Sequence, residues 1–248
     1  MKIHLLFKKE ELDETKLDDS KTVVIFDILL ATSTISACLS FGARAVIPTA
    51  NEDEAREAAK SWPAEEICVA GEWNGLPIDD FSYPLPLSLK QEVANKTLIL
   101  STTNGTVAIR KAAAARKVWI ASLLNGPAVA GKVHAEYEDE TILLVCAGSA
   151  NQFCLEDFYG AGYFLSELIR QAGKVQLTDS ALSAKLFYES QADRSEILLA
   201  GTKVGGSLLE FGLGEDLYFV SQKNQLETAP YLSGNQIICD RNVSVYNT

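Results

Sequence analysis

The side chains of this sequence that could do chemistry are carboxylates, amides and hydroxyls that follow short apolar runs. The carboxylates are Asp27, Glu72, Glu156 and Asp157, and the amides and hydroxyls are those of Asn74, Asn104, Ser101, Thr102 and Thr103. Oxygen ligands of this kind suit Mg²⁺ that keeps several of its waters. Beside helix N-termini, such an ion favours a phosphate ester. If these groups converge, they predict a magnesium-dependent site for a phosphorylated small molecule.

Residues 98–106 show this pattern most fully. Residues 98–100 are the apolar run of a buried strand, residues 101–104 are Ser-Thr-Thr-Asn, and Gly105 allows a turn. The Ala-rich stretch 107–115 predicts a helix. The unpaired N–H groups at a helix N-terminus suit an anion. Ser, Thr and Asn are also the usual helix caps, so a purely structural role stays open.

Asp27 is the carboxylate whose position asks for an explanation. It lies in the apolar run 23–28, and an acid there must be paired, metal-bound or at the end of the strand. Glu156 and Asp157 would suit the first turn of a helix through the helix dipole alone. Functional and structural interpretations of these acids therefore both remain open.

Several classes of site lack their signatures. No GxGxxG follows a strand, and neither the phosphate-binding GxxxxGK[ST] loop nor a GxSxG nucleophile elbow occurs. His4 and His134 have no nucleophile or carboxylate pattern around them, so we expect structural or exposed roles. The five cysteines show no metal-binding spacing and no disulfide pattern.

Strands and helices alternate along the chain. We expect strands at residues 3–7, 23–28, 45–47, 67–70, 98–100, 118–121, 141–145, 217–220 and 236–239. We expect helices at residues 35–41, 52–61, 107–115, 125–134, 181–189, 196–200 and 207–212, with a long helix after residue 154. This alternation predicts an α/β fold with a mixed or largely parallel sheet flanked by helices, where ligands bind beyond the carboxyl ends of strands.

The elements position the candidate residues in one unit. No linker divides residues 1–248, so we expect a single α/β unit, with a division into two lobes left open. The Pro- and Gly-containing stretch 71–86 is long for a connection inside a compact domain, and such loops are often functional.

Composition limits the partners. With 22 Lys and Arg against 33 Asp and Glu, the net charge is −11, which argues against nucleic acid or an anionic membrane as a partner. Local cations and dipoles can still bind a small anionic phosphate ester. The N-terminal apolar stretch is too short for a signal peptide, and no apolar run approaches the roughly 20 residues of a membrane span. Unpaired cysteines favour the reducing cytoplasm.

These stretches resemble the 2-phosphosulfolactate phosphatase family, the ComB-like proteins. The matching residues are Val-Val-Ile-Phe-Asp-Ile-Leu-Leu-Ala-Thr-Ser-Thr-Ile at 23–35, Gly-Glu-Trp-Asn-Gly at 71–75, Leu-Ser-Thr-Thr-Asn-Gly-Thr at 100–106, Ser-Leu-Leu-Asn at 122–125, and Leu-Val-Cys-Ala-Gly at 144–148 with Leu-Glu-Asp at 155–157. They occur in the family's order. The resemblance implies a ComB-like α/β fold and a Mg²⁺-dependent hydrolase that removes phosphate from 2-phospho-3-sulfolactate. It also implies a cytoplasmic homo-oligomer, which we expect to be a dimer.

The resemblance also implies roles for individual residues. Those implied to be catalytic are Asp27, Glu72 and Asn104; those implied to bind substrate are Thr32, Thr34, Asn74, Thr103, Gly105 and Thr106; and those implied to hold the metal are Asp27, Glu156 and Asp157.

Two departures from the family pattern bear on activity. Leu30 stands where the family usually has Arg, and residues 81–86 read Phe-Ser-Tyr-Pro-Leu-Pro instead of a Phe-Asp-x-Gly-Asn-Ser-Pro-like run. Losing a charge-assisted contact costs roughly 1.5–3 kcal/mol. Arg44, Arg110 or Lys203 could supply another cation. The alternative function is therefore a diverged member that hydrolyses a less anionic ester, acts weakly, or binds a small metabolite or a protein partner without turnover.

Overall fold

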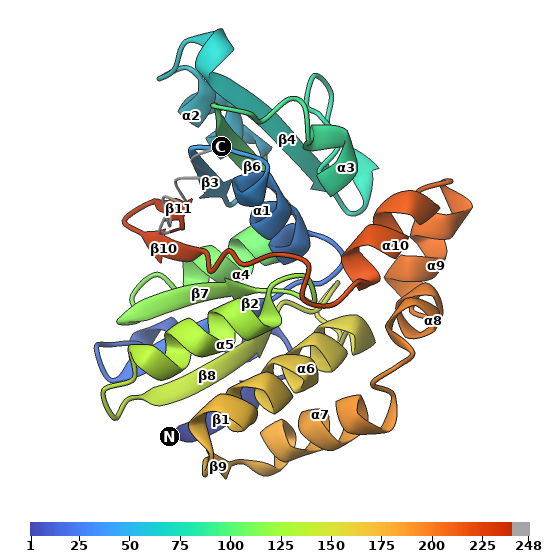
Figure 1. Cartoon of the computed structure of the whole chain (residues 1–248). Helices are drawn as coiled ribbons and strands as arrows, with labels where there is room; N and C mark the ends of the chain where they lie inside the picture. The colour runs from blue at the N-terminus through green and yellow to red at the C-terminus, as the bar shows by residue number, and fades with distance from the viewer. Residues whose placement is uncertain (240–248) are drawn as a thin grey trace, which may run out of the picture.

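The protein, described here by a computed structural model covering residues 1–239, is built on one mixed sheet (Figure 1). The strands are β1 (Lys2–Leu6), β2 (Lys21–Phe26), β3 (Ala45–Thr49), β4 (Ile67–Trp73), β5 (Leu76–Pro77), β6 (Thr97–Ser101), β7 (Lys117–Ala121), β8 (Thr141–Cys146), β9 (Gln176–Leu177), β10 (Tyr231–Ser233) and β11 (Gln236–Ile238). Within the described residues their order is β5-β4-β6-β3-β11-β10-β7-β2-β8-β1-β9.

Two parallel groups of strands make up most of the sheet. One group is β4, β6 and β3, and the other is β7, β2, β8, β1 and β9. The antiparallel hairpin of β10 and β11 lies between them. In the part of the chain that is described, β10 meets β7 at the Tyr231–Trp119 pair and β11 meets β3 at the Ile237–Val46 pair. The predicted α/β fold with a mixed, mostly parallel sheet is confirmed.

Helices cover both faces of the sheet. They are α1 (Ala31–Ser40), α2 (Glu52–Ala59), α3 (Pro86–Leu89), α4 (Gly105–Lys111), α5 (Gly126–Ala135), α6 (Leu155–Ala172), α7 (Asp179–Ser190), α8 (Ser195–Ala200), α9 (Lys203–Glu210) and α10 (Gly214–Ser221). Short 3₁₀ turns occur at Lys9–Glu11, Glu14–Lys16 and Ala64–Glu66. In Figure 1, α5 and α6 lie in front of the lower strands, and α8, α9 and α10 lie together at one side of the sheet.

The alternation of side chains in each strand divides the core into layers. Val23 and Ile25 of β2 pack with α1 and α4, whereas Val24 and Phe26 pack with α5 and α6. Successive side chains of a strand point to opposite faces, so the continuous apolar run of β2 supplies both layers. This burial on both faces is typical of a parallel sheet between helices.

One predicted element is wrong, and several have different bounds. Residues 217–220, expected to form a strand, lie in α10, where Leu217 and Val220 are buried three positions apart on one helix face. The predicted helix 107–115 is shorter, since α4 ends at Lys111. The predicted loop 71–86 contains the end of β4 and all of β5. Within residues 1–239, no helix is both long and apolar enough to cross a membrane.

Candidate active site

A cavity of about 430 Å³ lies where strands of both parallel groups end. Its polar side comes from the residues that follow β2, β6 and β8 and from the turn between β4 and β5. The helix α9 forms the opposite side. The structure thus brings together Asp27, Glu72, Asn74, Thr103, Asn104, Glu156 and Asp157, which all line this one cavity.

Asp27 is a buried carboxylate in the lining of the cavity. It is 7% exposed, and the backbone N–H of Ala31, the first residue of α1, donates to it. Burial, reinforced by the nearby charges of Glu72 and Glu156, raises the pKa of Asp27 from 3.8 to about 7. At neutral pH this carboxyl group can therefore gain or lose a proton, and a cation that binds it would displace the proton to solvent.

The start of α4 packs directly on Asp27. A Cβ on Gly105 would lie 2.5 Å from the Asp27 Oδ2 atom and would also clash with the Ala31 side chain. Only glycine allows this approach. Gly105 therefore joins the loop after β6 to the loop after β2.

Glu156 and Asp157 lie in the first turn of α6 and are both 3% exposed. The backbone N–H groups of Ile28 and Gly148 donate to the two Asp157 oxygens at 2.9 and 3.1 Å. Burial raises the pKa of both carboxyl groups, and for Asp157 the charges of Asp27 and Glu156 add to it. Asp157 thus fixes the ends of β2 and β8, while Glu156 lines the cavity beside it.

Glu72 holds two loops together. Its carboxylate accepts from the backbone N–H of Thr103 at 2.7 Å, the Thr103 hydroxyl at 3.1 Å and the backbone N–H of Gly75 at 2.6 Å. The Thr103 hydroxyl in turn accepts from the Asn74 N–H at 2.7 Å. Because both Glu72 oxygens accept backbone N–H groups, the geometry suits a positioning role.

Lys9 is a cation at this site that the sequence interpretation missed. It is only 7% exposed, and its Nζ donates to Asn104 Oδ1 at 2.8 Å and to the Ala147 carbonyl at 3.4 Å. It also forms an ion pair with Glu10 at 3.0 Å. The signal that could have identified Lys9 was its position soon after β1, because other site residues also come soon after strands.

The cations named from the sequence lie in different places. Arg44 pairs with Glu66 at 4.0 Å and Arg110 with Glu54 at 2.6 Å, both on the surface. Lys203, the first residue of α9, lines the cavity. Leu30 also lines it, together with Tyr83 and Pro84 of the altered 81–86 stretch.

Four predicted substrate-binding residues lie behind the cavity lining. The Thr32 hydroxyl accepts from the Asp27 N–H and donates to the Asp27 carbonyl, and the Thr34 hydroxyl donates to the Pro84 carbonyl at 2.8 Å. Thr106 exchanges hydrogen bonds with Thr102 across the start of α4. Gly105 makes the close approach described above. Each of the four shapes a loop that lines the cavity, and their predicted contact with substrate stays a prediction.

The donor chemistry favours a hard cation together with an oxyanion. Four carboxylates line the cavity, and neighbouring carboxylates add to the raised pKa values of Asp27 and Asp157, while the cations nearby in the described residues are Lys9 and Lys203. Among residues 1–239, no group of three or more acidic, His or Cys side chains is arranged to hold a metal ion by itself. Mg²⁺ commonly uses one or two carboxylates plus substrate phosphate, and that mode fits these residues.

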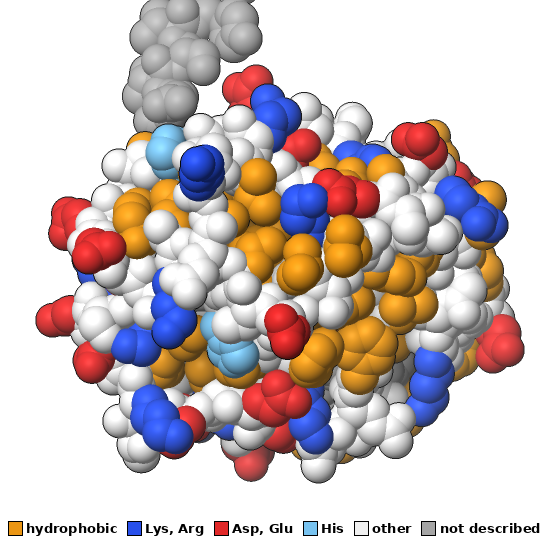
Figure 2. All heavy atoms as spheres, turned by 90° about the horizontal axis from the view of Figure 1, so that it is seen from below, with side chains coloured by type: hydrophobic (Ala, Val, Ile, Leu, Met, Phe, Trp, Pro, Cys, Tyr) orange, Lys and Arg blue, Asp and Glu red, His pale blue; other side chains and the backbone are white. Residues whose placement is uncertain are grey.

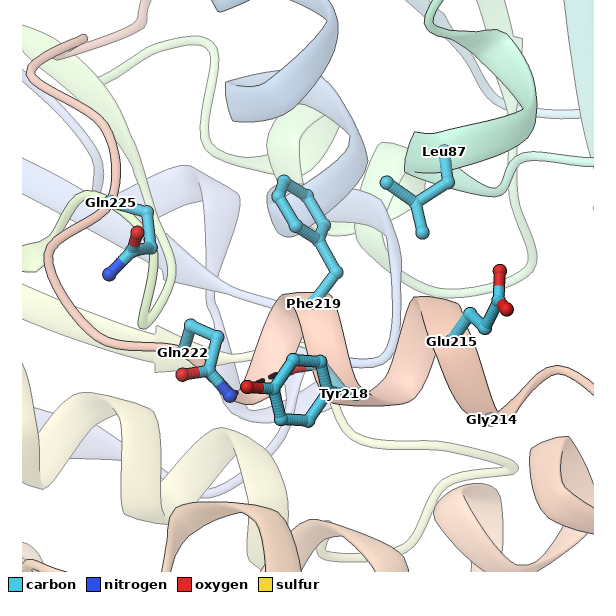
Figure 3. A pocket seen from close by; sticks show the side chains of 7 residues that line it. All are labelled: Leu87, Gly214, Glu215, Tyr218, Phe219, Gln222 and Gln225. Carbon is cyan, nitrogen blue, oxygen red and sulfur yellow. Dashed lines mark hydrogen bonds between the residues drawn. The ribbon is translucent and has the colours of Figure 1, made fainter.

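A larger hollow of about 610 Å³ lies elsewhere, against α10 (Figure 3). Leu87, Tyr218 and Phe219 line it with two glutamine side chains, and Glu215 is its acid. The Leu87 N–H donates to the buried Asp216 at 2.9 Å, which fixes α3 on α10. This hollow lacks paired carboxylates and cations among its lining residues, so the smaller cavity carries the candidate chemistry.

Comparison with known proteins gives consistent matches along the chain. Residues 6–235 match the model of a family described as 2-phosphosulpholactate phosphatase. A Clostridium perfringens protein named probable 2-phosphosulfolactate phosphatase is 39% identical over 92% of each chain. Proteins with the same name from Clostridium acetobutylicum and Symbiobacterium thermophilum are 32% and 34% identical, over 96% and 88% of this chain and 100% and 94% of their own.

Proposed function

Because the chain belongs to the 2-phosphosulpholactate phosphatase family, we propose that it is a phosphoric monoester hydrolase. Its substrate would be 2-phospho-3-sulfolactate or a related small phosphorylated acid, and its products the hydroxy acid and phosphate. The observation that carries this proposal is the cavity where the Lys9–Asn104 pair lies near the carboxylates of Asp27 and Glu156. Anion-binding and cation-binding groups are then available to one small ligand.

The proposal includes Mg²⁺ as the cofactor, held by Asp27 and Glu156 and by the phosphate of the substrate. The excess of buried carboxylates over cations supports this choice. When bound, the ion would neutralise charge on the phosphate and acidify a water molecule.

The residues of the chain have separate tasks in this reaction. Asn104 and the backbone N–H groups of Asn104 and Gly105 bind the phosphate oxygens, and Lys9, whose ammonium group holds Asn104, adds a positive charge that stabilises the charge developing on them. Glu72 and Asp157 hold the loops that carry these groups. Water attacks phosphorus as the ester P–O bond breaks; one proton of the water ends on the departing hydroxyl group and its oxygen stays on phosphate.

A phosphate-release assay tests the function. Purified protein is incubated with 2-phosphosulfolactate and other 2-phospho acids, with Mg²⁺ or with EDTA. We expect turnover that needs Mg²⁺ and falls by at least about a hundredfold in Asp27→Asn. Turnover that EDTA leaves unchanged would contradict the cofactor, and no turnover of any ester would favour a member that only binds its ligand.

We also propose a homodimer in the cytoplasm, without nucleic-acid or membrane partners, in line with the net charge of −11. Hydrophobic side chains gather over much of the lower face of the molecule (Figure 2). Leu182 and Leu186 of α7, which lies along that side in Figure 1, are exposed. An exposed apolar face supports association with a second copy. Light scattering should give the mass of a dimer, and Leu186→Asp should give a monomer; a monomeric parent protein would refute this assembly.

A further inference from the structure

Lys203 is the one Lys, Arg or His side chain that lines the cavity of the candidate active site in the described part of the chain. The Ser207 hydroxyl donates to its backbone carbonyl at 3.1 Å, whereas its ammonium group makes no hydrogen bond or ion pair within residues 1–239. A cation that lines a cavity and has no partner in the protein is available to an anionic group of a ligand.

The periodicity of α9 explains why Lys203 lines the cavity. The lining residues of this segment are Lys203, Val204, Ser207, Leu208 and Phe211. Their i, i+1, i+4, i+5, i+8 spacing is that of a single helix face. Lys203 therefore begins the face of α9 that borders the cavity, and its cation belongs to the site.

The start of α9 is fixed close to the carboxylates. The Thr202 hydroxyl caps the helix by accepting from the Gly205 N–H at 3.1 Å, and the Thr202 side chain lies beside the Glu156 carboxylate. Lys203 is the next residue in the chain. Its backbone is thus held near an acid that we propose to hold Mg²⁺, while its side chain remains free to meet a substrate.

The anionic groups of 2-phospho-3-sulfolactate differ in the partners they need. Its phosphate and carboxylate are both attached to C2, and both are oxygen ligands of the kind that Mg²⁺ prefers. The sulfonate is attached to C3 and is a much weaker base, so it is a poor ligand for a metal ion. A sulfonate that leaves water for the cavity needs the charge of a side chain instead.

Resting on the proposed function, we propose that Lys203 binds the sulfonate of 2-phospho-3-sulfolactate and determines the preference of the enzyme for sulfonated substrates. Leu30, which lines the same cavity, is neutral and cannot make this contact. Because the sulfonate takes no part in the breaking of the ester bond, the contact with Lys203 acts on KM more than on kcat.

Three esters distinguish the possible partners of Lys203. 2-Phosphosulfolactate has all three anionic groups, 2-phospholactate lacks the sulfonate, and the phosphate ester of 2-hydroxyethanesulfonate lacks the carboxylate. We expect Lys203→Met to lower kcat/KM about 5- to 30-fold for the two sulfonates, mainly through KM, and less than about twofold for 2-phospholactate. A loss that follows the carboxylate, a loss of equal size for all three esters, or no loss would overturn the proposal.

Two further variants are controls for this test. Lys203→Arg keeps the positive charge and should retain the preference for sulfonates. Lys185→Met removes one positive charge elsewhere, because Lys185 lies on α7, pairs with Glu189 at 2.7 Å and is not a lining residue of the cavity. It should change kcat/KM less than about twofold for each ester. Lys203 is exposed, so thermal unfolding of its variants should match that of the parent protein.

The same materials separate this inference from the function it rests on. If the parent protein hydrolyses the esters but Lys203→Met lowers kcat/KM equally for all of them, the inference is wrong and the phosphatase function stands. If none is hydrolysed, the phosphatase function fails, and calorimetric titration with 3-sulfolactate and lactate decides the inference. Tighter binding of 3-sulfolactate that Lys203→Met abolishes would then support it, and equal affinities of the parent protein for both acids would overturn it.

Discussion

At the scale of single residues, Asp27 shows how the site costs the fold stability. Its carboxyl group has a raised pKa because it is buried near Glu72 and Glu156. A group whose pKa is higher in the folded state binds more protons there than in the unfolded chain. Stability therefore falls as pH rises between 3.8 and about 7. The protein keeps an acid at this position at the expense of stability at neutral pH.

Asp27→Asn should accordingly stabilise the metal-free protein while it abolishes turnover. The neutral amide removes the penalty, so the gain in unfolding free energy should be about 2 kcal/mol larger near pH 8 than near pH 5. Denaturant unfolding in EDTA at both pH values measures this. Asp80→Asn, at an exposed carboxylate, is the control and should show no such difference. An equal gain at both pH values would refute the electrostatic cause.

Lys9→Met tests the cation that the sequence interpretation missed. The methionine keeps the length of the buried side chain but removes the donor to Asn104. We expect kcat/KM for the phosphate ester to fall about 10- to 100-fold, since a charge-assisted contact is lost.

Lys8→Met is the matched control for that change. The neighbouring Lys8 is half-buried and donates to Asn151 in an exposed hydrogen bond instead, so its loss should change kcat/KM less than about threefold. Similar losses of kcat/KM in both variants would mean that Lys9 contributes only to the overall positive charge of this region.

Sequence patterns could predict only part of the site. Asp27 could be singled out because an acid in an apolar run needs an explanation, and Glu72 and Asn104 because they follow the predicted strands 67–70 and 98–100. Lys9 could not be paired with Asn104, because 95 positions separate them and only the tertiary fold joins them. The sequence also could not indicate that the backbone N–H groups of Ile28 and Gly148 donate to Asp157 and that of Thr103 to Glu72, since these donors belong to other loops.

At the scale of elements, the site depends on how α4 begins. Gly105, its first residue, lies against Asp27 and Ala31, the first residue of α1. The two helices begin side by side, and the loops before them supply Asp27 and Asn104. Any side chain at this contact must push the two loops apart.

Gly105→Ala should therefore destabilise the protein by about 1–3 kcal/mol and lower turnover. Gly206→Ala is the control within a helix: no atom lies within 4 Å of a Cβ there, so it should stabilise α9 by about 0.5–1 kcal/mol. Thermal unfolding and phosphate release measure both variants. A Gly105→Ala protein with unchanged stability would show that the contact yields easily.

The elements were predicted well where periodicity was strong and poorly where segments were short. The runs of β2, β6 and β8 were found because continuous apolar residues mark strands buried on both faces. Residues 217–220 were assigned to a strand because four residues cannot distinguish Leu217 and Val220 on a helix face from a strand. Nothing in the sequence indicated that a hairpin would lie between two parallel groups.

At the scale of the whole molecule, a net charge of −11 repels an anionic substrate until the last few ångströms. Salt at 0.1 M screens that repulsion beyond about 10 Å, but it screens the attraction between the substrate and the buried Lys9 much less. We therefore expect kcat/KM to rise about two- to threefold as sodium chloride goes from low to physiological concentration. An ester whose one anionic group is the phosphate, such as phenyl phosphate, should show a smaller change in kcat/KM. A fall in kcat/KM with salt would mean that local attraction dominates the approach.

The hairpin of β10 and β11 also determines how the protein loses its activity under stress. In the described chain it adjoins each parallel group through one residue pair, Tyr231–Trp119 and Ile237–Val46. The helices α1 and α4 pack against strands of both groups, and the Lys9–Asn104 hydrogen bond also joins the two groups. Asp27 follows β2 of one parallel group, and Glu72 lies in β4 of the other. We expect mild denaturant or mechanical load to separate the two parallel groups at the hairpin first. Activity should then be lost before either group of strands unfolds.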